Sequence, residues 1–230
     1  MERENDIKYN EILLEKPEKR SIGSKILGFL TELGDLVILN WLWLVTSLPI
    51  FTIGASTAAL YSTFYDINSN FEGNTIKQYF KNFKDNFKQG TVAWLITVLG
   101  YLIAFCDAYF AFHGDRGTVF TIFFGFIFIF TFVAVSFTTT LVFPLIARYK
   151  NDLKHHFRNA LALSGFCFYY SLLMIFVLFF PMIVTFSFVV VFKFFGWLWL
   201  LCGFAFTFYV LSFIAMKIFK RIKIYEANGE

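Results

Sequence analysis

Residues 40–55 constrain this chain more than any other segment, because they place one apolar run on each side of a proline. The segment reads NWLWLVTSLPIFTIGA, and Pro49 stands inside it. Proline removes a backbone donor and disfavours the helical conformation of the residue before it, so helices usually end there. The segment therefore predicts two membrane-crossing helices joined by a turn at Pro49.

The composition predicts an all-α integral membrane protein. Hydrophobic residues make up 58% of the chain and charged residues only 16%, with a mean hydropathy of +0.64; soluble domains carry roughly 25% charged residues. The 35 Phe residues are spread over every apolar segment, which favours lipid contact and packing over an aromatic ligand box.

The apolar runs predict about six transmembrane helices, because each run is long enough, or nearly so, for a hydrocarbon core of about 30 Å. We expect a membrane domain over 29–216, between a polar N-terminal tail (1–28) that is no signal peptide and a C-terminal tail (217–230). The predicted spans are about 29–48, 50–66, 91–112, 117–147, 161–192 and 195–216.

The distribution of basic residues decides the expected orientation. Eighteen of the twenty Lys and Arg residues lie in the N-terminal tail, in 67–90, in 148–160 or after 216, and the other two are Arg116 and Lys193. Six crossings place the eighteen on one side, which the positive-inside rule makes the cytoplasm, together with both termini. Two alternatives stay open: 29–66 as a single span, or 50–66 as a re-entrant segment.

Two cytoplasmic connectors, at about 75–89 and 149–160, have the pattern of basic amphipathic helices. In the first connector, Tyr79, Phe80, Phe83 and Phe87 recur at helical spacing beside a separate stripe of lysines. Such helices bind anionic headgroups at the membrane surface or dock on a partner protein, and the tethered, aromatic face disfavours nucleic acid. The candidate contact residues are Lys77, Lys81, Lys84, Lys88, Lys154 and Arg158.

The two connectors also resemble each other, because residues 83–90 and 153–160 have apolar and basic positions in register, each directly before a span. This predicts a parallel two-half repeat, with chance similarity between basic connectors as the alternative.

Three polar residues of the first span, Glu32, Asp35 and Asn40, form a candidate intramembrane site for a cation or a proton relay. The alternative places both acids at headgroup depth, where the helix dipole favours them. The three Cys and three His residues lack metal-ligand spacing, so we expect no metal site. The sequence contains no Gly-rich phosphate loop after a strand, no nucleophile elbow and no HExxH motif, so we expect no cofactor and no enzyme activity.

Three segments resemble the signature of the YesL family, small polytopic bacterial membrane proteins that contain a domain of unknown function. They read LGDLVILNWLW (33–43), SLPIFTIGA (47–55) and YFKNFKDNFKQ (79–89). Beyond about 33–90 the resemblance rests on the order of spans and on the second connector. It implies a bacterial cytoplasmic membrane protein associated with carbohydrate uptake, beside an ABC sugar transporter, and it assigns no catalytic residues.

Two functions therefore stay open: a non-enzymatic accessory or regulatory protein of carbohydrate uptake, and a small permease with a polar path between its helices. The sequence does not decide whether copies of the chain form a homo-oligomer.

Overall fold

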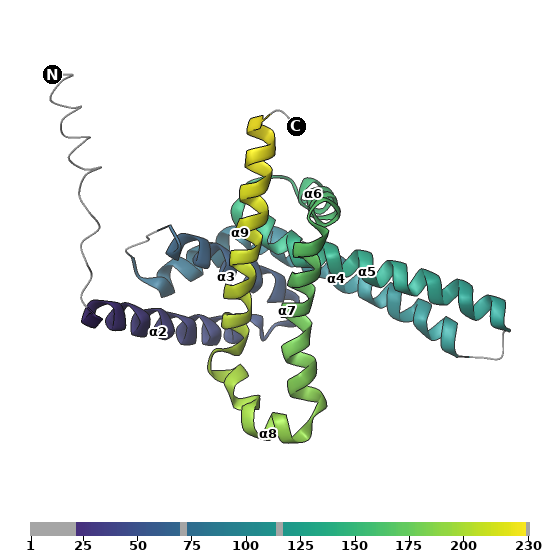
Figure 1. The fold of residues 1–230 in the computed structure, drawn as a ribbon, viewed down its shortest axis with the longest axis horizontal. Helices are drawn as coiled ribbons and strands as arrows, with labels where there is room; N and C mark the ends of the chain where they lie inside the picture. Colours follow the sequence, from purple (N-terminus) through teal and green to yellow (C-terminus); the bar gives the residue numbers. More distant parts are fainter. Residues whose placement is uncertain (1–21, 70–72, 114–116, 229–230) are drawn as a thin grey trace. The chain divides into compact units, whose positions relative to one another are not determined.

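The computed structural model describes residues 22–69, 73–113 and 117–228, with side chains from Thr31 to Arg221, and these residues are all-helical, without a strand (Figure 1). The chain divides into two compact units, Met1–Asp35 and Leu36–Glu230. The described part of the first unit is the start of helix α2 (Ile22–Ser47), and the second unit contains everything that follows Asp35.

The helix break predicted at Pro49 is present. α2 ends at Ser47, Pro49 caps the short 3-10 helix η1 (Ile50–Thr52), and α3 (Ile53–Ile67) begins directly after it. The turn is fixed by the Thr52 hydroxyl, which donates to the carbonyl oxygens of Thr46 (2.6 Å) and Pro49 (2.8 Å).

The central helix of the second unit is α3, which packs against α4 (Thr75–Phe112), α5 (Thr118–Arg148) and α9 (Phe204–Asn228). Every residue of α3 from Gly54 to Tyr65 is buried. Two of its buried hydroxyl groups do not need water, because Ser56 and Thr63 donate to main-chain oxygens one turn earlier. This explains why α3 is more polar than a lipid-facing span.

The next two helices, α4 and α5, lie side by side as a long hairpin (Figure 1). A separate connector helix over 75–89 is not seen, because α4 runs without interruption through Gly90 to Phe112. Its 38 residues span about 57 Å at 1.5 Å per residue, far more than a hydrocarbon core of about 30 Å. The half of α4 that carries the lysines therefore extends beyond the length that a membrane core accepts.

The remainder of the chain is more divided than the expected spans over 161–192 and 195–216. α6 (Leu153–Phe166) and α7 (Phe168–Ser187) are separated at Cys167, and α8 (Val189–Leu198) begins after another break at Phe188. A π-helical turn, η2 (Trp199–Gly203), then joins α8 to α9, and the chain changes direction there (Figure 1). α7 and α9 pack against each other.

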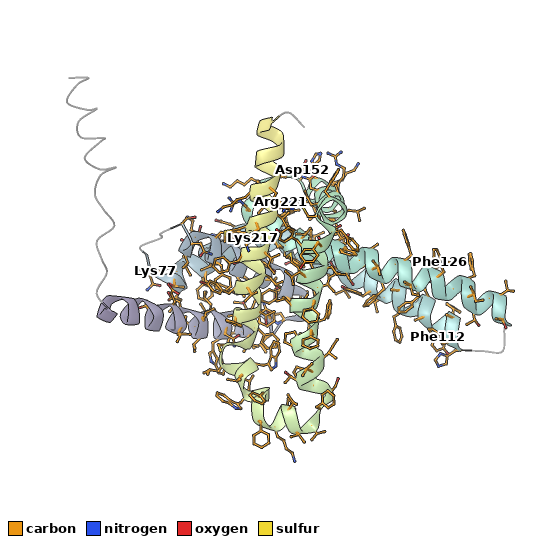
Figure 2. All side chains as sticks on the ribbon, viewed as in Figure 1. Lys77, Phe112, Phe126, Asp152, Lys217 and Arg221 are labelled. Carbon is orange, nitrogen blue, oxygen red and sulfur yellow. The ribbon has the colours of Figure 1, made fainter. Side chains whose placement is uncertain are left out.

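Four helices of the described chain are long and apolar enough to cross a membrane, judged by length and composition. They are α4, α5, α7 and the stretch of α8, η2 and α9 from Val189 to Arg221, which is counted as one helix. Large apolar side chains project outward from them, such as Phe112 and Phe126, which are 70% and 69% exposed (Figure 2). Together with the four apolar helices, exposed apolar surface of this extent is typical of a membrane-embedded protein.

Candidate functional site

The contact between α3 and α4 is a close crossing of two backbones at Gly54 and Gly90. A Cβ atom on Gly90 would lie 2.7 Å from the Ala55 Cα atom and 2.9 Å from its nitrogen. A Cβ atom on Gly54 would overlap the Gly90 carbonyl oxygen. Small residues allow membrane helices to approach in this way, so the two glycines fix where α3 crosses α4.

Beside this crossing, a row of amide side chains on α4 binds polar groups of α3. The Asp66 carboxylate accepts hydrogen bonds from Gln78 Nε2 (2.5 Å) and Asn82 Nδ2 (2.9 Å), and Asn82 also donates to the Thr63 hydroxyl (3.1 Å). One turn further along α4, Asn86 Nδ2 donates to the Ser62 hydroxyl at 3.0 Å.

The row continues to α5 and to the segment after it. Ser62 Oγ donates to the Ala147 carbonyl oxygen (3.0 Å), and Gln89 Nε2 donates to the Asn151 carbonyl oxygen (2.8 Å). The amide row thus joins α3, α4 and the carboxyl end of α5. Each of its donors has an acceptor, which is how polar groups stabilise packed membrane helices.

The amide row was not predicted from the sequence. Gln78, Asn82, Asn86 and Gln89 recur every three or four residues, which is the spacing of one helix face, and this signal was readable. The apolar stripe was predicted to contact the membrane surface or a partner protein, yet Tyr79 is fully buried and Phe83 packs against the same core, whereas Phe80 and Phe87 are exposed. The Tyr79 hydroxyl lies 2.7 Å from the Thr46 hydroxyl of α2.

Asn40, one of the predicted polar residues, holds the π-helical turn. The side chain is fully buried, and its Nδ2 donates to the carbonyl oxygens of Trp199 (3.1 Å) and Leu200 (2.9 Å). Its Oδ1 accepts the Ala205 amide at 3.0 Å. A π-turn leaves main-chain groups out of the regular helix ladder, and Asn40 supplies partners for three of them.

The two acids predicted to accompany Asn40 lie in the first unit. Glu32 is exposed and Asp35 is half-buried, one turn apart on α2. The six basic residues predicted to contact a surface or a partner, Lys77, Lys81, Lys84, Lys88, Lys154 and Arg158, are all exposed.

The interior of the second unit contains a cavity of about 250 Å³ enclosed by aromatic side chains, among them Trp43, Tyr61, Trp94 and Phe208. Several of its polar groups already have hydrogen-bond partners. Trp43 Nε1 donates to the Thr57 hydroxyl (3.2 Å), and the Thr139 hydroxyl donates to the Val135 carbonyl oxygen (2.7 Å). A cavity lined in this way accepts an apolar guest rather than a hydrated one.

His156 is a buried titratable group on α6. Its imidazole is fully buried, and neither ring nitrogen has a hydrogen-bond partner among the residues that the structure describes. Desolvation lowers the pKa of His156 below its ordinary value of 6.5, and this outweighs the attraction of the Asp152 carboxylate, which raises it. The buried ring is therefore neutral at neutral pH.

We predict that acid destabilises the protein through His156. The unfolded state binds a proton near pH 6.5 and the folded state only at lower pH, so stability is complete above about pH 6.5 and falls as the pH drops through the folded pKa. His156→Leu should flatten the melting temperature of the purified protein between about pH 7 and pH 5. His155→Leu, at the exposed neighbouring position, is the control; equal pH dependence of both variants would contradict the prediction.

Possible metal ligands do not gather in the described part of the chain. No group of three or more His, Cys, Asp or Glu residues there lies close enough to hold a metal ion. Cys106, Cys167 and Cys202 are free thiols.

The comparison with known families places the site within a recognised domain. Residues 36–108 match the family described as "Protein of unknown function, DUF624". The match includes Asn40, the Gly54–Gly90 crossing and the whole amide row. No curated protein and no solved structure matches the chain.

Proposed function

We propose that this chain, which carries an uncharacterised domain over 36–108 and four apolar helices of membrane-spanning length, is a multi-pass protein of the bacterial cytoplasmic membrane. In this proposal it belongs to the YesL family and serves as a non-enzymatic accessory or regulatory protein of carbohydrate uptake. Both termini are cytoplasmic, and its partners are anionic lipid and an ABC sugar transporter.

The proposed six crossings add α2 and the pair η1–α3 to the four apolar helices. The four alone already put the start of α4, the segment from the end of α5 to α7 and the end of the last helix on one side, because two crossings separate each of these from the next. Twelve of the twenty Lys and Arg residues lie in these three places, four in each, which supports a cytoplasmic location. A hairpin of α2 and α3 places the basic N-terminal tail there too.

We predict that the turn at Pro49 and helix α8 face the outside. Single cysteines in place of Ile50 and Lys193, both exposed, should react with a membrane-impermeant maleimide on intact cells, in a background without native cysteines. Cysteines in place of the exposed Asn68 and Lys150 should react only after the cells are opened. Labelling of Asn68→Cys from outside would contradict the six-crossing topology.

The observation that carries the accessory role is the contrast between interior and cytoplasmic polar groups. In the described second unit, the side-chain amides of Asn40, Asn82, Asn86 and Gln89 form hydrogen bonds that hold segments of the chain together. The six basic contact residues are exposed, and no ion pair within the described residues uses any of them. These cations are thus available to phosphate headgroups or to an acidic protein surface.

The test is to purify the tagged full chain from its native membranes in mild detergent and to quantify what accompanies it. We expect subunits of a sugar transporter in stoichiometric amounts. They should be lost when Lys77, Lys81, Lys84 and Lys88 are changed to Gln but not to Arg, because Arg keeps the charge. A chain that purifies alone at every detergent concentration would contradict the accessory role.

The interior cavity favours a second candidate, a small permease. Its apolar lining argues for an apolar solute rather than a sugar or an ion. Solute uptake by proteoliposomes that contain only this protein would establish the permease and reject the accessory role.

A further inference from the structure

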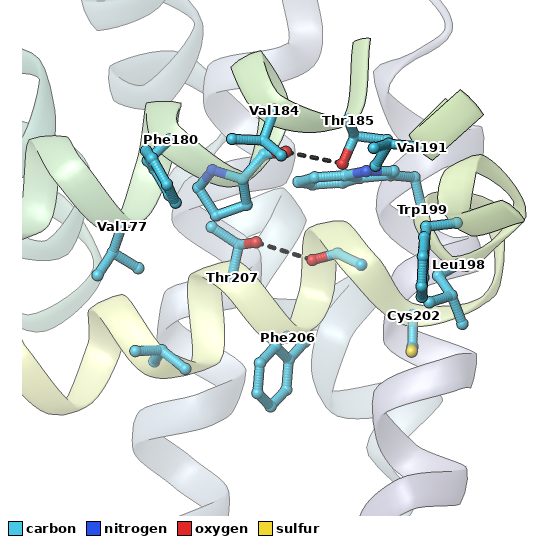
Figure 3. A pocket seen from close by; sticks show the side chains of 14 residues that line it. Val177, Phe180, Val184, Thr185, Val191, Leu198, Trp199, Cys202, Phe206 and Thr207 are labelled. Carbon is cyan, nitrogen blue, oxygen red and sulfur yellow. Dashed lines mark hydrogen bonds between the residues drawn. The ribbon is translucent and has the colours of Figure 1, made fainter. Parts of the chain in front are cut away.

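A second cavity lies between α7 and α9, with α8 and the π-turn at one end (Figure 3). This groove has a volume of about 460 Å³. Its lining is apolar and comes from all three helices: Val177 and Phe180 from α7, Val191 and Phe195 from α8, and Phe206 and Val210 from α9.

The two hydroxyl groups in the lining are engaged within their own helices. Thr185 Oγ1 donates to the Pro181 carbonyl oxygen (2.7 Å) and Thr207 Oγ1 to the Gly203 carbonyl oxygen (2.9 Å), as the dashed lines in Figure 3 show. Both hydroxyl hydrogens are therefore already donated in hydrogen bonds to the main chain. Hydrated molecules would lose hydrogen bonds on entering such a groove, whereas a hydrocarbon chain would lose none.

Trp199 separates the groove from the interior cavity, because it lines both of them, as does Thr207. The indole is buried, and the main-chain oxygen of Trp199 is held by Asn40. The ring lies against Gly203, where an added Cβ atom would meet it at 3.0 Å. Trp199 is thus a fixed wall whose fluorescence reports on what fills the groove.

The apolar region that contains the groove carries one positive charge, on Lys193. Lys193 is the only charged residue in 168–216 and is exposed on α8. Val191 and Phe195 face the groove from positions two residues before and after it, so Lys193 lies on the opposite side of α8 at 100° per residue. A lysine near the end of a membrane helix extends toward the phosphate layer.

We propose that this groove binds one acyl chain of an anionic phospholipid, whose phosphate lies in the headgroup layer that Lys193 faces from the other side of α8. The groove supplies the hydrocarbon surface, and Lys193 supplies the one cation that the region contains. The site does not depend on the accessory role or on the transporter partner.

The test uses the full chain in lipid nanodiscs, with Trp41, Trp43, Trp94 and Trp197 replaced by Phe. Phosphatidylglycerol with brominated acyl chains should quench the remaining Trp199, although it is only 8% exposed. Val184→Phe, which fills the groove, should remove most of this quenching. Val133→Phe, on the exposed face of α5, should leave it unchanged. Brominated phosphatidylcholine should quench less, and Lys193→Gln should abolish that difference between the two lipids.

Two results would overturn the proposal. One is an unquenched Trp199 in discs where a variant that retains only Trp197, 57% exposed, is quenched. The other is quenching of Trp199 that Val184→Phe does not change. Equal quenching by both lipids would reject the role of Lys193.

A second measurement avoids the multiple Trp replacements. Cys202 lines the groove, and in a variant with Cys106→Ser and Cys167→Ser it is the single thiol. Phosphatidylglycerol added to the detergent-solubilised protein should slow its reaction with N-phenylmaleimide, and phosphatidylcholine should slow it less. An unchanged rate with both lipids would contradict an occupied groove.

Discussion

Gly90→Ala is expected to destabilise the protein strongly, although the same change stabilises most helices. The new methyl group would lie 2.7 Å from Ala55 Cα and 2.9 Å from its nitrogen, and backbone atoms cannot move aside as a flexible side chain can. Overpacking of this kind costs about 1–3 kcal/mol, occasionally more. We expect a lower melting temperature in detergent and a lower yield of monodisperse protein.

Gly125→Ala is the matched control for this variant. Gly125 also lies inside a helix, but a Cβ atom there would meet nothing within 4 Å. Alanine is favoured over glycine by about 1 kcal/mol in a helix interior, so the control should be neutral or stabilised. If both variants gained stability, α3 and α4 would not be in contact at Gly90.

Asn40→Ala is the second change for which we expect a large effect. It removes three hydrogen bonds and leaves the Trp199 and Leu200 carbonyl oxygens and the Ala205 amide without this partner. Hydrogen bonds between membrane helices contribute about 1–2 kcal/mol in model peptides and less in intact proteins, so we expect a loss of roughly 2–4 kcal/mol. Unfolding of the purified protein in a detergent–denaturant series measures it.

The control for Asn40→Ala is Asn68→Ala, at an exposed position next to the end of α3. It should change stability by less than about 0.5 kcal/mol. Asn40→Ala should also change the fluorescence of Trp199, because it releases the main chain of that residue. A stable variant with an unchanged spectrum would show that the π-turn holds without Asn40.

The positions where helices begin and end were predictable only where the sequence contains a local signal. Pro49 marks the break after α2, and the polar segment after α5 marks its end at Arg148, one residue beyond the expected span. The break at Phe188 falls inside continuous apolar sequence, with no glycine or proline at that position. Hydropathy alone cannot locate this break, because α7 and α8 on its two sides are equally apolar.

The candidate site was predictable in part. Asn40 stood out as a polar residue in an apolar run, but its partners lie about 160 residues away on the π-turn, and no local pattern identifies them. The amide row was overlooked because lysines and aromatics of the same helix gave stronger stripes. Tyr79 shows the remaining ambiguity, since an apolar face pattern is the same whether lipid or protein covers it.

The burial of α3 has a consequence for the order in which the chain assembles during synthesis. At 15 residues α3 is about 22 Å long, shorter than a hydrocarbon core of about 30 Å, and its Ser and Thr residues make it a poor substrate for independent insertion. The helices that cover it, α4, α5 and finally α9, are all translated later. In a nascent chain, α3 is therefore incompletely covered until α9 has been synthesised. Translation that stops before α9 would leave an intermediate with an exposed α3, which quality-control proteases would degrade.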